Sequence, residues 1–331
     1  MVTTNPLDVM PTMSADLVRV EGELLASVTS QDPYLTEIAG HLIKAGGKRV
    51  RPGFCIAAAA TAAGSDGVAT ADIIKAAVSV ELVHLGSLYH DDVMDDAITR
   101  RTVESVNAKW GNLKAILAGD FLLARASEIA SSLGVEVAGL LASTIARLCE
   151  GQVLELRFTY DTARTEDAYL RSIDGKTAAL LATASRIGGI VAELPPEQIE
   201  ALTTFGHAYG MAFQVVDDVL DLVATEAELG KPAGHDMEEG VYTLPVLRAL
   251  ASDAGDELRP LLTDHMTADD RARAVEIVAG GGWITGAVEV ARSHAARAVE
   301  ALDRFPSGPG VDGLSAAAAH LVDSVEAAAA R

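Results

Sequence analysis

Two copies of one acidic motif, each inside a mainly apolar segment, constrain this chain more than any other feature. Residues 91–95 and 217–221 both read Asp-Asp-x-x-Asp. On a helix that turns by about 100° per residue, positions i, i+1 and i+4 lie on one side, so each motif directs three carboxylates one way. Mainly apolar residues precede both motifs, over 76–88 and 211–216. Burying three like charges is very costly unless metal ions or cations compensate them.

The two motifs suit a divalent cation and an anionic substrate. Magnesium prefers oxygen ligands and is usually held by one or two carboxylates together with the phosphates of a substrate. One such motif among 47 acidic residues would indicate only a solvated helix face, but its repetition in apolar surroundings favours a magnesium and diphosphate enzyme. The candidate metal ligands are Asp91, Asp92, Asp95, Asp217, Asp218 and Asp221.

The composition favours an all-α protein. Alanine is abundant, aromatic residues make up only 4%, and no long segment alternates apolar and polar residues as a strand would. With 331 residues and 49% hydrophobic content the chain can bury a sizeable core, and we expect a single domain over 1–331. The alanine-rich part over 243–331 has no catalytic spacing and is assigned to packing.

Charge and cysteine content exclude several classes of function. The formal charge of −21 argues against binding to nucleic acid or anionic lipid. The two cysteines, Cys55 and Cys149, form neither a disulfide framework nor a metal-ligand spacing, and we expect buried free thiols. The N-terminus lacks a signal-peptide pattern, and the longest apolar stretch, 54–63, is about half a membrane span. We therefore expect a cytosolic protein without a transmembrane segment.

Helical patterning and its stop signals place the motifs. Thr70 can cap a long helix that runs into the first acidic motif, and the second motif ends a helix over 196–222. Further helices are predicted over 14–29, 33–45, 52–64, 113–133, 135–158 and 165–193, the last interrupted at 174–175. The polar segment 225–240 is either a lid or a surface loop, and Lys231 slightly favours the lid.

Basic residues gather in three loops beside the acidic helices. Lys48, Arg49 and Arg51 lie between a helix stop at Gly46-Gly47 and a helix start at Pro52. Such a segment can be an ordinary solvated turn, but glycines followed by cations at a helix N-terminus also make an anion cradle. Two further loops repeat the pattern, with Arg100-Arg101 and Lys176-Thr177. Together they suggest two anionic substrates, one bound through metal and one directly by cations.

These blocks, in this order, resemble the trans-isoprenyl (polyprenyl) diphosphate synthases. The resemblance covers about residues 35–250 and rests on GGKRVRP, His84 seven residues before DDVMD, Arg100-Arg101, GKT, FQVVDDVLD and GKPAGHD. It implies one helical domain of isoprenoid-synthase type around a central cavity, usually a homodimer. It also implies transfer of an allylic prenyl group, from farnesyl or geranylgeranyl diphosphate, onto isopentenyl diphosphate.

The resemblance implies a role for each matching residue. Magnesium on the allylic diphosphate would be held by Asp91, Asp95 and Asp217, supported by Asp92, Asp218 and Asp221. Isopentenyl diphosphate would be bound by Lys48, Arg51, His84 and Arg101. The allylic diphosphate would be contacted by Arg100, Lys176, Thr177, Gln214 and Lys231. A lone histidine such as His84 is more often a satisfied core residue, but the helical wheel places it on the face of Asp91.

Small residues before the first motif predict a long product. In the family, bulky residues four or five positions earlier block the growing chain, and here these positions are Ser87 and Gly86. We expect a hexaprenyl to decaprenyl product, with geranylgeranyl diphosphate as the alternative. The chain departs from the common pattern at Gly86, Gln152 and His235, none of which is a predicted metal ligand.

Two other classes of protein share part of the pattern. A terpene cyclase also ionises a prenyl diphosphate, but it does not need an isopentenyl site such as Lys48, Arg51 and His84. A non-catalytic subunit of a heteromeric synthase generally lacks the acidic motifs that this chain has twice. Both remain alternatives to the synthase.

Overall fold

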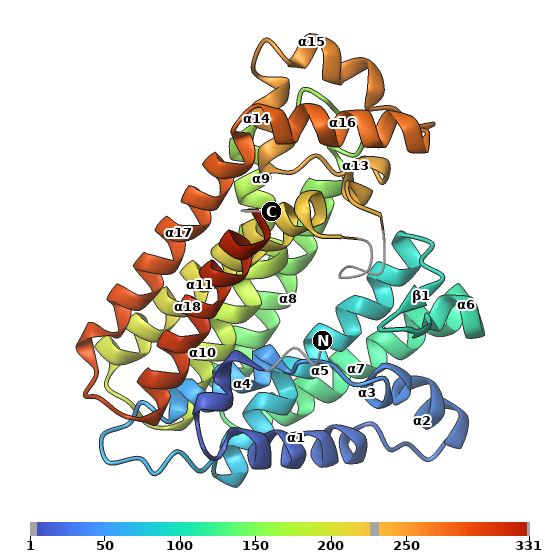
Figure 1. The fold of residues 1–331 in the computed structure, drawn as a ribbon. Helices are drawn as coiled ribbons and strands as arrows, with labels where there is room; N and C mark the ends of the chain where they lie inside the picture. Colours follow the sequence, from blue (N-terminus) through green and yellow to red (C-terminus); the bar gives the residue numbers. More distant parts are fainter. Residues whose placement is uncertain (1–4, 226–231, 330–331) are drawn as a thin grey trace. The chain divides into compact units, whose positions relative to one another are not determined.

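Helices form nearly all the regular structure of this protein, as the composition predicts. The computed structural model describes residues 5–225 and 232–329 (Figure 1). Within them the only strands are β1 (Thr99–Arg100) and β2 (Val103–Glu104), an antiparallel pair in which Thr99 lies opposite Glu104. The all-α prediction is confirmed.

The chain divides into two compact units. The first comprises Met1–Ile145, Leu180–Gly206 and Leu302–Ala316, and the second Ala146–Ala179, His207–Ala301 and Ala317–Arg331. Each unit contains one of the acidic motifs. The helices that contribute residues to both units are α8 (Val135–Leu156), α10 (Ala179–Val191), α11 (Pro196–Val223) and α18 (Pro309–Ala329).

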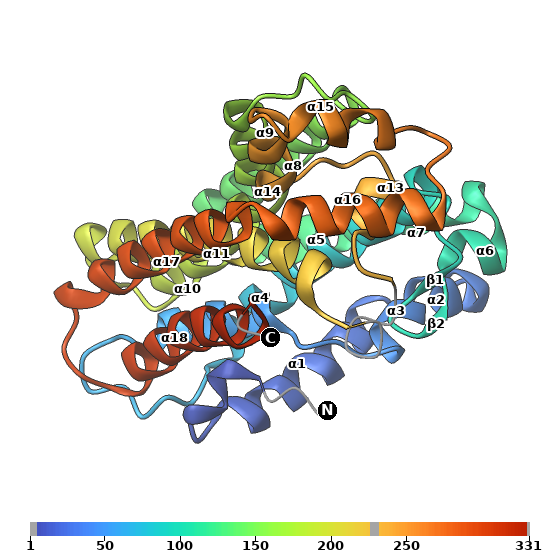
Figure 2. The same ribbon diagram turned by 45° about the horizontal axis from the view of Figure 1, so that its top comes forward.

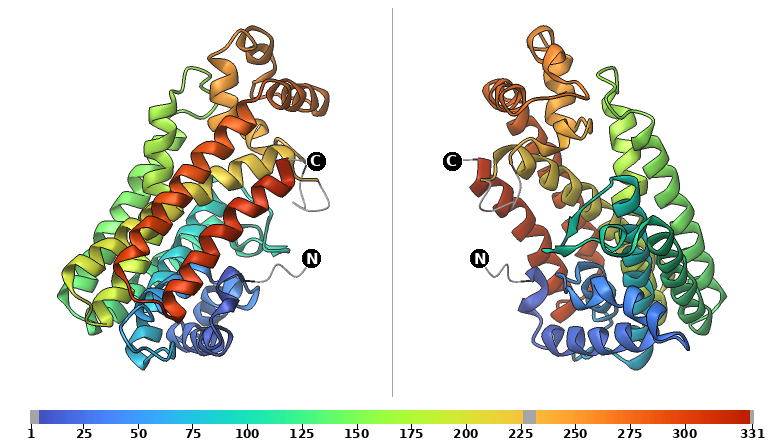
Figure 3. Two further views of the ribbon diagram at one scale, coloured as in Figure 1. Left: turned by 60° about the vertical axis from the view of Figure 1, so that its left-hand side comes forward. Right: turned by 90° about the vertical axis from the view of Figure 1, so that its right-hand side faces the viewer.

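The first unit is built around α5 (Ala71–Met94), which carries the first acidic motif. Its N-cap Thr70 accepts a hydrogen bond from the Ile73 amide, so the predicted cap is confirmed. Helix α5 packs against α1 (Met13–Ser27), α4 (Val50–Ala59) and most extensively α7 (Asn112–Ser132) (Figures 1 and 3). The remaining helices of this part are α2 (Pro33–Ala39), α3 (His41–Lys44) and α6 (Val106–Trp110).

Glycines let α5 and α7 approach closely. A Cβ on Gly86 would lie 3.1 Å from the Gly119 carbonyl oxygen and 3.1 Å from the Leu123 side chain. Since 3.1 Å is tighter than an ordinary van der Waals contact, a side chain at residue 86 would push the two helices apart. The absence of a side chain at Gly86 therefore has a packing reason within this unit.

The second unit carries the other acidic motif at the end of α11. Helix α9 (Glu166–Ile173) continues into a π-helical turn, η2 (Asp174–Ala178), at the interruption predicted for 174–175. Four further helices here are α13 (His235–Glu238), α15 (Gly255–Leu258), α16 (Ala268–Gly280) and α17 (Trp283–Ala301). Helix α14 (Leu244–Leu250) packs against α9, α16 and α17, and α13 packs against α16 (Figure 2).

The structure corrects two expectations from the sequence, on one helix and one cysteine, and bears on a third, the absence of a membrane span. The helix predicted over 33–45 is broken at Gly40, which ends α2 and precedes α3. Cys55 is buried as predicted, but Cys149 is exposed on α8. Helix α8 is, among the described residues, the one helix long and apolar enough to cross a membrane by length and composition alone. Because soluble proteins contain helices that pass this test, it is weak evidence for a membrane span.

Candidate active site

The basic loop before α4 is fixed by a buried ion pair. Arg49 adopts the left-handed conformation (φ 47°, ψ 42°), and its Nη1 donates to Glu81 Oε1 at 2.8 Å. Arg49 also pairs with Glu21 and donates to the Ile43 carbonyl oxygen at 3.0 Å. Glu81, on α5, is only 1% exposed. Arg49 therefore attaches the loop to α1 and α5, and its guanidinium is occupied by these partners.

Three of the residues predicted to bind isopentenyl diphosphate gather beside this anchor. Burial lowers the pKa of Arg51, the negative charge of Glu81 opposes that shift, and the positive charge of Arg101 adds to it. The Nε atom of Arg51 is buried and has no hydrogen-bond partner among the residues described. A buried, unpaired N–H group next to a second cation is a site at which an anion would be stabilised.

His84 completes this cluster in its neutral form. Burial lowers the pKa of His84 well below its usual 6.5, and the charges of Arg51 and Arg101 act in the same direction. Lys48 is exposed on the same loop. The first unit thus brings Arg51, His84 and Arg101 together, with Lys48 exposed on the same loop.

The hairpin that carries the second cation is conformationally strained. Arg101 and Thr102 both have positive φ, 53° and 66°, in the two-residue turn between β1 and β2. The Arg101 guanidinium donates to the carbonyl oxygens of Gly46 and Leu42. Such backbone conformations cost about 1–3 kcal/mol for residues other than glycine and often occur at functional sites.

The three carboxylates of the first motif differ in exposure. Asp92 is fully buried and accepts a hydrogen bond from Arg100 Nε at 2.7 Å, whereas Asp91 is half-buried and Asp95 is exposed. Burial raises the pKa of Asp92, and Arg100 opposes that shift. Its second oxygen, Oδ2, is buried without a hydrogen-bond partner in the described part of the chain. Arg100, predicted to contact the allylic diphosphate, holds Asp92 in this structure.

The second unit contains three of the five residues predicted for the allylic side, Lys176, Thr177 and Gln214. Lys176 pairs with Glu155 of α8, and Thr177 Oγ1 donates to Gln214 Oε1 at 2.6 Å. Both Lys176 and Thr177 lie in the π-helical turn η2. That turn is held at its first residue, since Asp174 accepts from His207 at 2.5 Å and from Arg147 at 2.8 Å. Lys231 lies outside the described residues.

The second acidic motif also has one buried central carboxylate. Asp217 is exposed, but Asp218 is 4% exposed and accepts from Tyr169 Oη at 2.5 Å and Gln214 Nε2 at 2.8 Å. Burial raises the pKa of Asp218 well above its usual range, and the nearby carboxylates of Asp236 and Asp217 raise it further. Asp221 is buried too and accepts from the Asp236 amide at 3.2 Å.

Sequence analysis missed three residues that support these sites: Glu81, Glu155 and Tyr169. For two of them, the sequence contains a pattern that could have identified them. Glu81 lies one helical turn before His84, and an acidic residue inside an apolar helix implies a buried partner. Tyr169 precedes Lys176 by two helical turns, which indicates a shared helix face. Glu155 gave no such signal, because its pairing depends on tertiary contact between α8 and η2.

The acidic residues fit a metal that is shared with a ligand. Within residues 5–225 and 232–329, no group of three His, Cys, Asp or Glu side chains is close enough to hold an ion on its own. Carboxylates that stay accessible, such as Asp91 and Asp217, are the donors that magnesium uses together with substrate phosphates. The donor set therefore fits magnesium carried in with a diphosphate.

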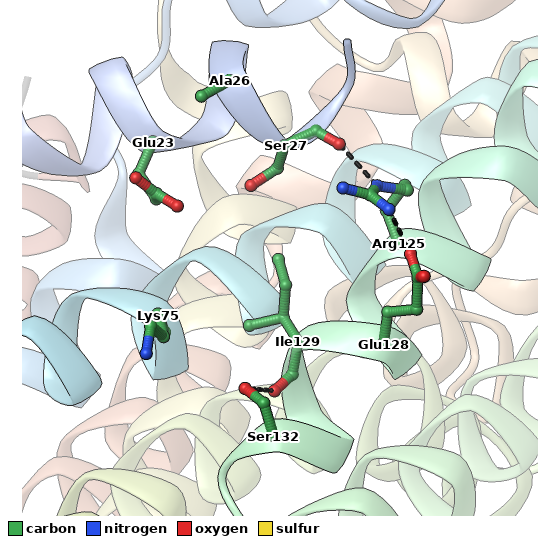
Figure 4. Close-up of a pocket in the computed structure, with 8 residues that line it drawn as sticks. All are labelled: Glu23, Ala26, Ser27, Lys75, Arg125, Glu128, Ile129 and Ser132. Carbon is green, nitrogen blue, oxygen red and sulfur yellow. Dashed lines mark hydrogen bonds and ion pairs between the residues drawn. The ribbon is translucent and has the colours of Figure 1, made fainter. Parts of the chain in front are cut away.

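The first unit has an open pocket of about 350 Å³ that none of these carboxylates lines (Figure 4). Charged and polar side chains from α1, α5 and α7 line most of it, including Glu23, Lys75, Arg125 and Glu128. Arg125 donates to the Ser27 carbonyl oxygen at 2.6 Å and pairs with Glu128. The acidic and basic side chains of this lining compensate one another's charge. A charged, polar lining does not suit an apolar product chain.

The two residues predicted to gate chain length differ in position. Gly86 is buried against α7, as described above. Ser87 is half-buried, and its hydroxyl donates to the His84 carbonyl oxygen at 2.9 Å. A larger side chain at residue 87 would therefore extend from a partly open position, whereas one at residue 86 would meet α7.

Comparison with known proteins identifies the class. A nonaprenyl diphosphate synthase from Mycobacterium tuberculosis is 38% identical over 305 residues, covering 91% of this chain and 90% of the relative. The crystal structure of a decaprenyl diphosphate synthase from Rhodobacter capsulatus matches with a TM-score of 0.88 and 33% identity, covering 96% of this chain and 98% of the other. The fold is therefore the all-α isoprenoid synthase fold.

A family model identifies the family within this class of proteins. The polyprenyl synthetase model matches residues 32–278, and the chain belongs to that family of prenyltransferases. A geranylgeranyl pyrophosphate synthase from Corynebacterium glutamicum, complexed with calcium and isoprenyl diphosphate, matches with a TM-score of 0.83 and 38% identity over 96% of this chain and 98% of the other. The resemblance drawn from the six sequence blocks is confirmed.

Proposed function

We propose that this chain is a magnesium-dependent trans-polyprenyl diphosphate synthase. It condenses isopentenyl diphosphate with an allylic diphosphate, farnesyl or geranylgeranyl, and releases diphosphate. The observation that carries the proposal is the cation cluster of the first unit, in which Arg51 has a buried, unpaired N–H beside Arg101 and a neutral His84. This cluster lies in the same unit as one Asp-rich motif, and the second unit contains the other.

The cation cluster supplies the isopentenyl site of the proposed reaction. Lys48, Arg51 and Arg101 bind the diphosphate group, and neutral His84 donates a hydrogen bond without adding charge. A terpene cyclase does not need such a site. The cluster therefore favours a synthase over a cyclase.

The second unit supplies groups for the leaving diphosphate. As the allylic C–O bond breaks, its electron pair goes to the diphosphate oxygen, and positive charge develops on the prenyl carbon. Lys176 and Thr177 lie together in η2 and stabilise the departing anion most as the transition state forms. The isopentenyl double bond then bonds to the allylic carbon, and the proton lost afterwards goes to the released diphosphate.

Magnesium belongs with the accessible carboxylates. Bound there, it would neutralise charge on the diphosphate and so make it a better leaving group. Asp91, Asp95 and Asp217 would hold it, with Asp92, Asp218 and Asp221 in support. The solved relative from Corynebacterium glutamicum, which contains calcium and isoprenyl diphosphate, supports a divalent cation at such a site.

A long product is proposed from the small residue Ser87 and from the relatives. Curated relatives include nonaprenyl and octaprenyl diphosphate synthases. Similar proteins also include a geranylgeranyl diphosphate synthase, from Methanosarcina mazei, which keeps the shorter product as the second candidate. The proposed range is hexaprenyl to decaprenyl.

We also propose that residues 1–331 act as one functional domain and that the chain is a cytosolic homodimer. Helix α7 exposes Leu113 by 80% and Leu117 by 65%, an apolar surface that suits a second copy of the chain. If the same interface also covers α8, the apolar character of that helix is explained without a membrane. Light scattering should then give about twice the 34.4 kDa mass of one chain.

One incubation separates the alternatives. The purified chain alone is mixed with labelled isopentenyl diphosphate, farnesyl diphosphate and Mg²⁺, and the products are separated by chromatography. Elongated prenyl diphosphate identifies a synthase, whereas a hydrocarbon would identify a cyclase. No turnover until a second, different chain is added would identify a subunit of a heteromeric enzyme.

A further inference from the structure

A buried tyrosine, Tyr169, donates a hydrogen bond to the central carboxylate of the second acidic motif. Tyr169, on α9, is 2% exposed, and its hydroxyl donates to Asp218 Oδ2 at 2.5 Å. Asp218 is itself 4% exposed. A buried carboxylate needs hydrogen-bond donors to offset its desolvation, and Tyr169 and Gln214 each supply one.

The contact continues from Asp218 to the residues proposed for the allylic diphosphate. Gln214 Nε2 donates to Asp218 Oδ1 at 2.8 Å, and Gln214 Oε1 accepts from Thr177 Oγ1 at 2.6 Å. Because the amide nitrogen of Gln214 donates to Asp218, the carbonyl oxygen of the same amide is turned toward Thr177. The orientation of Gln214 is therefore set from the Asp218 side.

Arg164 supports the tyrosine in turn. Its guanidinium carbon lies 5.6 Å from the centre of the Tyr169 ring, and Nη1 donates to the Tyr242 carbonyl oxygen at 3.3 Å. Arg164 is 5% exposed, and its Nε and Nη2 have no hydrogen-bond partner within the described chain. Packed beside the ring, this buried guanidinium restricts the position of Tyr169.

We propose that Tyr169 is a positioning residue for allylic diphosphate binding. Its hydroxyl fixes Asp218, and Asp218 fixes the amide of Gln214. Gln214 in turn fixes the hydroxyl of Thr177. The inference rests on the proposed function, because it assumes that Gln214 and Thr177 contact the diphosphate. Tyr169 itself is buried and touches no substrate.

The variant Tyr169→Phe removes one hydroxyl and leaves the ring in place. Tyr242→Phe is the matched control, because Tyr242 is equally buried in the same unit and its hydroxyl donates to the Leu262 carbonyl oxygen at 3.3 Å. Both variants lose a buried hydroxyl, so both should melt at a lower temperature than wild type when free of ligand. Only Tyr169→Phe should affect the allylic site.

Two measurements test this role. The first is the rise in melting temperature on adding Mg²⁺ and inorganic pyrophosphate, which should be reduced in Tyr169→Phe and unchanged in Tyr242→Phe. The second is steady-state kinetics, in which Tyr169→Phe should raise KM for the allylic substrate about tenfold and leave KM for isopentenyl diphosphate unchanged. Wild-type values for both in Tyr169→Phe would overturn the proposal.

A double variant tests whether the residues act in one chain of contacts. If Tyr169 works by orienting Gln214, then Tyr169→Phe/Gln214→Ala should bind the allylic substrate no worse than Gln214→Ala alone. Additive losses would contradict the proposal. Should Tyr169→Phe not fold, Tyr169→Phe/Asp218→Asn is compared with Asp218→Asn alone, and the two should bind the allylic substrate equally because Tyr169 acts through Asp218. A further loss in the double variant would contradict the proposal. Absence of turnover and of the pyrophosphate effect in wild type would overturn the proposed function and this role together.

Discussion

The guanidinium of Arg101 lies directly against the α-carbon of Gly47. A Cβ at residue 47 would be 2.8 Å from Arg101 Nη1 and 2.9 Å from Cζ, and Gly47 has a φ of 152°. The glycine-rich start of the basic loop thus has a steric purpose. It lets a cation of the β1–β2 hairpin pack onto the loop that carries Lys48 and Arg51.

Replacing Gly47 should therefore damage isopentenyl diphosphate binding. In Gly47→Ala the methyl group displaces Arg101, and kcat/KM for isopentenyl diphosphate should fall at least about tenfold, or ~1.4 kcal/mol. Gly46→Ala is the control, because Gly46 also has positive φ (83°) but a Cβ there meets nothing within 4 Å. It should cost about 1 kcal/mol of stability and leave the KM nearly unchanged. Equal KM values for both variants would show that the Arg101 contact is unimportant.

Loss of the buried partner of Arg49 should destabilise the first unit. The Arg49 and Glu81 side chains are each 2% exposed, so Glu81→Gln leaves a buried guanidinium poorly compensated. We expect a loss of about 3–5 kcal/mol in the free energy of unfolding, measured by urea denaturation. The exposed pair between Lys75 and Asp72 is the comparison, and Asp72→Ala should have a far smaller effect. A loss in Glu81→Gln no larger than in Asp72→Ala would contradict the assignment of Arg49 as an anchor.

Ser87→Phe should shorten the product. The residue is half-buried one turn before Asp91, and a phenyl ring there would obstruct a chain growing along α5. Chromatography of the products should show fewer isoprene units at unchanged initial rate. Gly86→Phe is a less useful test, because the contact with Gly119 predicts disruption of α5 and α7 packing. Products of wild-type length from Ser87→Phe would remove this residue as the gate.

His84 should make stability depend on pH on the acid side. Its pKa in the folded protein lies well below the usual 6.5, so the unfolded chain binds more protons once the pH drops below about 6.5. The stabilisation that neutral His84 contributes is fully present above about pH 6.5. It is lost as the pH falls toward the pKa of His84 in the folded protein. In His84→Gln this contribution is absent, so its unfolding free energy should decline less between pH 6.5 and pH 5 than that of wild type. Parallel pH profiles would mean that His84 is not held neutral.

The sequence predicted most of the helices because helices depend on local pattern. Thr70 caps α5 as expected, and the interruption at 174–175 is a π-helical turn. What the pattern could not predict is which charged groups are held by protein partners. Arg49 and Arg100 looked like Arg51 and Arg101 in the sequence, yet the first two are paired with Glu81 and Asp92. Those partners come from other elements, so only the tertiary structure separates anchoring cations from binding cations.

The proposed function requires that Asp91 and Asp217 act on one magnesium-bound diphosphate. Calorimetric titration with the allylic diphosphate in Mg²⁺ tests it in wild type, Asp91→Asn, Asp217→Asn and the double variant. If the two carboxylates hold the same head group, each single change should weaken binding strongly and the double change should cost clearly less than the sum of the two. Strictly additive losses, or wild-type affinity in either single variant, would contradict the account.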